Sequence, residues 1–143
     1  MLTEPQQLFI NALKSGEFEQ GEGTLRRIDG TWCCLGVACE TYRLATGKGK
    51  WEEYSTIGRY DFITDDERDN GVMPYVVSHW LGLGGSQNPD LTSEDGSLRA
   101  SASAFNDGSN IDDDNPYNVK WNFEQIADGF RRLFEEENEE AED

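Results

Sequence analysis

Apolar residues recur with a helical period at the start of the chain. The members of this first stripe lie on one predicted helical face, at Leu8, Phe9, Ala12 and Leu13. Thr3 and Gln6 stand in the order of a capping box, and Gly16 can end the segment. The pattern therefore predicts a helix that begins after Thr3 and ends before Gly16.

Two more helices are predicted in the middle of the chain. One begins near Cys34 and ends near Gly47, and its apolar face holds Leu35, Ala38, Cys39, Tyr42 and Ala45. The segment MPYVVSHWLGLGG predicts the other, because Pro74 is tolerated in a first helical turn and glycines follow Leu83. The stretch 48–71 between them has the least regular pattern and predicts no regular element.

The clearest stripe lies near the end of the chain. Asn122 is a favourable N-cap, and the apolar positions behind it share one helical face: Phe123, Ile126, Ala127, Phe130, Leu133 and Phe134. The last nine residues, EEENEEAED, contain seven acids and no base. Dense like charge without an apolar face disfavours folding, so we expect a globular domain over 1–134 and a disordered acidic tail over 135–143.

A hairpin signal follows the first predicted helix. The runs TLRRI and TWCCL flank Asp29-Gly30, a dipeptide favoured in the type I′ turns of two-residue hairpins. With the helical stripes, this signal predicts a single small α+β domain. We expect three to four helices packed on a small antiparallel sheet that begins with the hairpin at 24–34.

Charge narrows the function classes. The 143 residues include 29 acids against 12 Lys and Arg, and the formal net charge is −17. Such a surface repels phosphate backbones, so direct nucleic-acid binding is disfavoured and a partner with a basic surface is favoured. Three cysteines do not form a disulfide framework, and no apolar run is long enough to span a membrane. We therefore expect a protein of a reducing cytoplasm that needs no membrane and no cofactor.

The segment WCCLGVACETY holds all three cysteines and raises the question of catalysis. Cys34 could lie at a helix start, where the helix dipole favours a thiolate, and His79 is the one imidazole that could serve as its base. The alternative is a packed core, because free cysteine is among the most buried residue types. The apolar neighbours favour the core, and we predict no catalytic residue while keeping Cys34 and His79 as candidates.

Metal and small-ligand sites have weaker signals. One histidine and three cysteines without paired spacing do not make a zinc site, and the acidic loops fail the EF-hand pattern. An anionic ligand such as a nucleotide would need basic and aromatic side chains, for which the candidates are Arg26, Arg43 and Trp51. Acidic clusters supply the candidates for partner binding: Asp65, Asp66, Glu67, Asp112, Asp113 and Asp114.

Four segments together resemble a family of small uncharacterised bacteriophage and prophage proteins. They are NALKSGEFEQGEGTLRR, WCCLGVACETY, MPYVVSHWLGLGGSQNPDL, and AFNDGSN followed by NFEQIADGFRRLF. They occur in the family's order and cover most of residues 11–134, whereas IDDDNPYNVKW and the acidic tail are extra here. The resemblance implies an accessory protein that acts in the host cytoplasm during infection, and it brings no established activity.

Two functional hypotheses follow. The first is a non-catalytic acidic protein that binds and inhibits a host protein, such as a defence or nucleic-acid-binding factor, with DNA mimicry as one form. The second is a module that binds or sequesters a small ligand such as a nucleotide, with a Cys/His hydrolase as a further alternative. The oligomeric state stays open.

Overall fold

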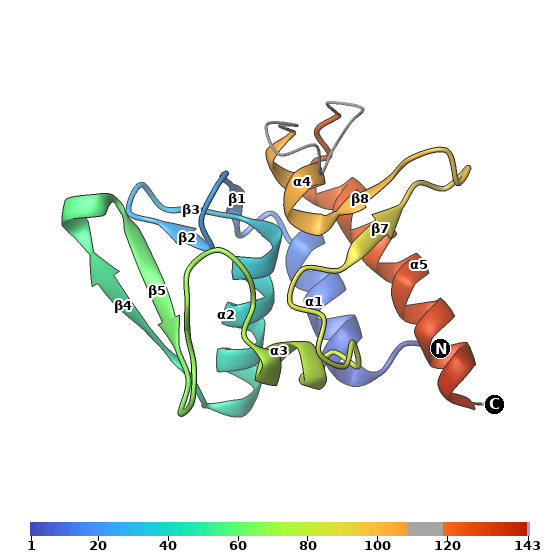
Figure 1. Cartoon of the computed structure of the whole chain (residues 1–143), viewed down its shortest axis with the longest axis horizontal. Coiled ribbons are helices and arrows are strands. Elements are labelled where there is room, and N and C mark those ends of the chain that lie inside the picture. The colour runs from blue at the N-terminus through green and yellow to red at the C-terminus, as the bar shows by residue number, and fades with distance from the viewer. Residues whose placement is uncertain (109–118, 143) are drawn as a thin grey trace.

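A computed structural model of the chain describes residues 1–108 and 119–142 (Figure 1). Within these residues the helices are α1 (Glu4–Lys14), α2 (Cys34–Thr46), α3 (Tyr75–Trp80), α4 (Ala102–Asp107) and α5 (Phe123–Glu142), with a 3-10 turn η1 (Ser55–Ile57). The strands are β1 (Glu19–Gln20), β2 (Arg26–Arg27), β3 (Thr31–Trp32), β4 (Lys50–Tyr54), β5 (Arg59–Ile63), β6 (Arg68–Asp69), β7 (Asp90–Thr92) and β8 (Arg99–Ser101). The predicted small α+β domain is confirmed, with five helices in the described residues instead of three or four.

The main sheet has the strand order β1-β3-β2-β5-β4, and β6 pairs with β5 beside this path. The predicted hairpin exists as β2 and β3, which pair antiparallel at Arg26 and Trp32, but its loop spans residues 28–30 and is not the predicted two-residue turn. Its turn carries Gly30 with φ 92°, a conformation open to glycine at little cost. The sheet is mixed and not purely antiparallel, because β1 runs parallel to β3 after the crossover through β2.

The longest strand pair, β4 with β5, lies where the sequence predicted no regular element. All five residues of β4 pair with β5, from Lys50 opposite Ile63 to Tyr54 opposite Arg59. One face of the pair is charged: Asp61 of β5, whose side chain is 5% exposed, pairs with both Arg59 and Arg68. Because these charged residues interrupt any apolar alternation, the hydrophobic pattern alone did not reveal the strands.

The helices form successive layers over one face of the sheet. Figure 1 shows α2 between the sheet and α1, and α5 beyond α1. The capping box of α1 is confirmed, since the Thr3 side chain accepts from the Gln6 N–H and the Gln6 side chain accepts from the Thr3 N–H. Phe9 packs edge-on against Phe130 of α5, with ring centroids 4.8 Å apart. The buried face of α1 is turned from the predicted stripe, because Ile10 is buried and Leu8 is 39% exposed.

Helix α5 continues to Glu142, where the sequence predicted a disordered tail from residue 135. Among the side chains that the structure describes in α5, the last buried apolar one is Phe134, so the following turns need another stabilising contact. Asn138 provides it: the side-chain amide donates to the backbone oxygen of Met1 and to Oε1 of Gln6, at 2.6 and 2.9 Å. These contacts join the acidic turns to the N-terminus of α1 and stabilise the helix there.

Candidate functional site

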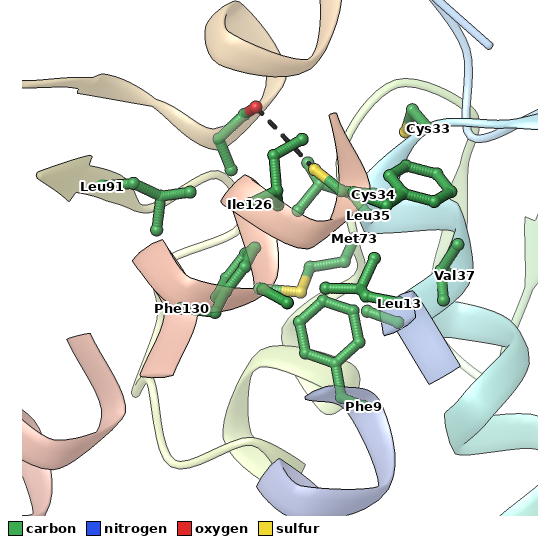
Figure 2. Packing of buried hydrophobic residues seen from close by; sticks show 14 of the residues in the cluster. Phe9, Leu13, Cys33, Cys34, Leu35, Val37, Met73, Leu91, Ile126 and Phe130 are labelled. Carbon is green, nitrogen blue, oxygen red and sulfur yellow. Dashed lines mark hydrogen bonds between the residues drawn. The ribbon is translucent and has the colours of Figure 1, made fainter. Parts of the chain in front are cut away.

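Cys34 begins α2 and is wholly buried. Figure 2 shows it within the packed apolar cluster, next to Leu35 and near Ile126 of α5. Its Sγ lies 3.7 Å from the backbone oxygen of Ala102. Burial raises the pKa of the Cys34 and Cys39 thiols well above the usual value and that of Cys33 to about 12. At neutral pH these thiols stay protonated, and the structure places the cysteine segment in the core.

His79 does not meet Cys34. It lies in the last turn of α3 with an exposed side chain, and no hydrogen bond or ion pair joins the two residues. A nucleophile and its base need to be within hydrogen-bond reach. The structure therefore does not bring the two catalytic candidates together.

Asn106 organises the start of α2 and was missed in the sequence. Its fully buried side chain accepts from the Cys34 N–H at 3.1 Å and donates to the backbone oxygen of Gly21 at 2.8 Å. The helix start thereby gains a partner for an otherwise unpaired N–H group. Asn106 belongs to α4, which is far from α2 in the sequence. The only sequence signal for its role was its place in the segment AFND, which is part of the family resemblance.

The ligand candidates Arg26, Arg43 and Trp51 do come together, around Glu40 of α2. One carboxylate oxygen of Glu40 accepts from Arg43 Nε at 2.6 Å and from Trp51 Nε1 at 3.0 Å. The Arg26 guanidinium lies 5.6 Å from the centroid of Trp51 and 4.0 Å from that of Tyr60. We call these residues, with Trp32, the Glu40 cluster.

Some of the charged groups of the Glu40 cluster already pair with one another. Burial opposes ionisation of Glu40, but hydrogen bonds from Arg43 and Trp51 and the nearby arginine charges outweigh it and lower the pKa of the carboxyl. Arg43 is committed to this bidentate pair, which also raises the pKa of its guanidinium. Arg26 differs: within the described part of the chain its side chain makes no hydrogen bond or ion pair, while the rings of Trp32, Trp51 and Tyr60 lie near its guanidinium. Its N–H groups can therefore donate to a carboxylate or phosphate.

The partner-binding candidates separate into three groups. Asp65 and Asp66 are exposed in the turn between β5 and β6, beside a polar hollow of about 420 Å³. Glu67 has a structural role, because its carboxylate accepts from the Tyr75 N–H at 2.9 Å at the start of α3. The third group, Asp112, Asp113 and Asp114, lies outside the described residues.

The last turns of α5 present a second acidic surface that the candidate set omitted. We define the α5 acidic face as the exposed residues Glu135, Glu136, Glu139 and Glu140. Among the described residues none of them forms an ion pair or a side-chain hydrogen bond. The sequence signal was the acidic run itself. The surface was missed because the run was expected to be disordered, whereas the structure holds these charges on a helix.

A groove of about 400 Å³ lies between α1 and α2. Leu8 and Ala12 line it from α1, Leu44 and Ala45 from α2, and Phe18 from the segment after α1. Leu44 is 67% exposed, although most other residues of α2 are buried. The groove is therefore an apolar surface open to solvent.

A search of the described residues finds no group of three or more His, Cys, Asp or Glu side chains able to hold a metal ion. The same residues contain no helix that is both long and apolar enough to cross a bilayer.

A protein-family model described as "Domain of unknown function (DUF8296)" matches residues 1–133. No curated protein and no solved structure matches the chain.

Proposed function

The chain belongs to the family described as Domain of unknown function (DUF8296), and we propose that it is a non-catalytic binding protein whose acidic surface recognises a partner with a basic surface. In the bacteriophage setting that the sequence resemblance implies, the partner is a protein of the host cytoplasm, such as a defence or nucleic-acid-binding factor. Binding blocks the partner's basic groove.

The observation that carries the proposal is the α5 acidic face. Its four carboxylates are exposed and unpaired within the described residues, and the tie from Asn138 to α1 holds the helix that carries them. Carboxylates four residues apart lie about 6 Å from each other along a helix, a spacing comparable with that of neighbouring phosphates on one strand. An ordered row of this kind can occupy a surface that binds a nucleic-acid backbone, which is the geometry of a DNA mimic.

The distribution of basic residues also supports recognition of a basic partner. Most of the described arginines and lysines are bound to acids in ion pairs, at Lys14, Arg27, Arg43, Arg59, Arg68, Arg99 and Lys120. The remaining acids greatly outnumber the remaining bases, so the excess negative charge stays available to a partner. The buried, protonated thiols favour binding over thiol chemistry.

The test is affinity capture from host lysate with three forms of the full chain. The first is the natural sequence. The second removes three of the four charges of the α5 acidic face through Glu135→Gln, Glu136→Gln and Glu139→Gln. The third is a control with the same change in net charge at exposed acids elsewhere, through Glu19→Gln, Glu94→Gln and Glu124→Gln.

We expect one basic protein to be captured by the natural chain and the control and lost by the α5 variant. Because exposed charges are screened by salt, capture should also fall as ionic strength rises to about 0.5 M. Capture that persists unchanged in the α5 variant and at high salt would contradict recognition by this acidic face.

A second candidate function is favoured by Arg26, whose unpaired N–H groups lie among three aromatic rings. This arrangement could hold a small anionic ligand such as a nucleotide. A thermal-unfolding screen with nucleotides tests it, since a ligand at 100 times its Kd adds about 2.7 kcal/mol to stability. We expect Arg26→Gln to abolish any such shift, and a shift that survives this change would exclude the Glu40 cluster as the site.

A further inference from the structure

The groove between α1 and α2 has a shape into which a third helix can pack. Leu8 and Ala12 of α1 and its C-cap residue Ser15 follow one another at intervals of four and three residues, and Leu44 of α2 lines the same groove. Phe18 also lines it, and its ring packs edge-on against Trp32 with centroids 5.2 Å apart. Two helix flanks and a packed aromatic ring make a groove that an amphipathic helix can fill.

The negative charge at the groove and on the whole chain favours a basic partner helix. Of the described residues that line it, Glu17 alone is charged, and its carboxylate has no ion pair or side-chain hydrogen bond in the structure. A second copy of this chain would bring another net charge of −17 to the same place, which opposes self-association. A helix that carries basic residues beside its apolar stripe is instead attracted.

We propose that the α1–α2 groove docks a basic amphipathic helix of the partner protein, with the apolar side chains of that helix against Leu8, Phe18 and Leu44 and a basic side chain near Glu17. The inference rests on the proposed function, and it assigns the specific contact to a surface distinct from the α5 acidic face. The acidic surface attracts the partner, and the groove provides apolar contacts of the kind that form the core of protein interfaces.

The test uses two model peptides and the full chain. One peptide, of about 18 residues so that a helix can form, has Leu at helical spacing and Lys elsewhere. The other has the same charge and carries Ala in place of each Leu. Binding is measured by titration calorimetry to the natural chain, to Leu44→Asp and to Ile57→Asp, a control at another exposed apolar residue.

The design separates apolar docking from charge attraction. Leu44→Asp adds a negative charge, so attraction alone predicts tighter binding of the basic peptide, whereas groove docking predicts weaker binding. Ile57→Asp adds the same charge outside the groove. Both residues are largely exposed, at 67% and 56%, so the fold should tolerate either change, and circular dichroism checks this.

We expect the Leu–Lys peptide to bind at least about tenfold more tightly than the Ala–Lys peptide, and Leu44→Asp to remove at least about tenfold of that affinity. Ile57→Asp should leave it unchanged or slightly tighter. Glu17→Gln should weaken binding by about two- to fivefold, and more than Glu19→Gln does.

Equal binding of the two peptides, or undiminished binding to Leu44→Asp, would overturn the groove proposal and leave recognition by the acidic surface standing. Failure of both peptides to bind at low salt would contradict both proposals. Sedimentation that shows a dimer of the natural chain, dissociated by Leu44→Asp, would assign the groove to a second copy and overturn the proposed occupant.

Discussion

Asn106→Leu tests whether a single buried amide holds the start of α2 in place. Leucine has a similar size but neither donates nor accepts hydrogen bonds, so the change removes polar contacts without opening a large cavity. In the natural chain the Asn106 side chain accepts from the Cys34 N–H at 3.1 Å and donates to the Gly21 oxygen at 2.8 Å. The side chain is 0% exposed, so water does not easily replace these contacts.

The magnitude follows from the groups left unpaired. Each buried donor or acceptor without a partner costs about 1–3 kcal/mol, and Cys34 N–H and the Gly21 oxygen both lose theirs. We therefore expect a loss of about 2–6 kcal/mol in the free energy of unfolding. For a chain of this length that corresponds to a fall in Tm of about 6–20 °C.

Two measurements check this expectation. Guanidinium unfolding gives the change in stability, and reaction of the buried thiols with an aromatic disulfide reports opening around Cys34, which should become faster in the variant. Asn122→Ala is the matched control: its side chain accepts from the Gln125 N–H at 2.8 Å, but it is exposed, so the loss should be only about 1 kcal/mol. A loss for Asn106→Leu no greater than that of the control would refute the argument.

Three further predictions concern buried or partly buried polar groups. Cys34→Ser should cost about 1–3 kcal/mol, because a hydroxyl replaces a thiol in an apolar site; unchanged denaturant midpoints would contradict a core role. Arg68→Met should cost about 1–2 kcal/mol, because the Arg68 side chain is 46% exposed and Arg59 still pairs with the 5% exposed Asp61; Asp61→Asn in the same chain should recover part of the loss in thermal unfolding. Asp69→Asn should stabilise the protein at pH 7 by less than about 1 kcal/mol, since burial and the nearby acids Glu67 and Asp61 raise the pKa of Asp69. Ionising the Asp69 carboxyl costs stability as pH rises above its pKa in the unfolded chain, near 3.8. The stabilisation by Asp69→Asn should therefore vanish below that pH, and a constant stabilisation across pH 3–7 would contradict this explanation.

Local sequence signals predicted the elements that depend on nearby residues. The capping box at Thr3 and the stripe from Phe123 to Phe134 each combine an N-terminal signal with a 3.6-residue period, and both helices occur. Asp29-Gly30 likewise marked the position of the hairpin, although the loop has three residues, 28–30, instead of the predicted two. The cysteine segment was correctly predicted to pack in the core, and Gly36 is needed there because an added Cβ would strike the backbone oxygen of Leu25.

The β4–β5 pair and the end of α5 could not be predicted in the same way. Strands β4 and β5 alternate little, since ion pairs with Arg68 of the neighbouring strand stabilise charged residues that a single strand would not bury. The acidic turns of α5 stay helical through Asn138, whose partners lie more than a hundred residues earlier in the chain. Composition alone contains no sign of such a distant contact.

The sequence by itself determined the class of fold, the acidic character and the burial of the cysteines, because periodicity, charge and apolar neighbours are local properties of a chain. Only the tertiary structure brought Arg26, Arg43 and Trp51 to Glu40, and only it left Leu8 and Leu44 exposed on adjoining helices. Both outcomes depend on how α2 packs between the sheet and α1. That packing sets which face of each helix is covered, and a periodic pattern fixes a face only to within about one residue.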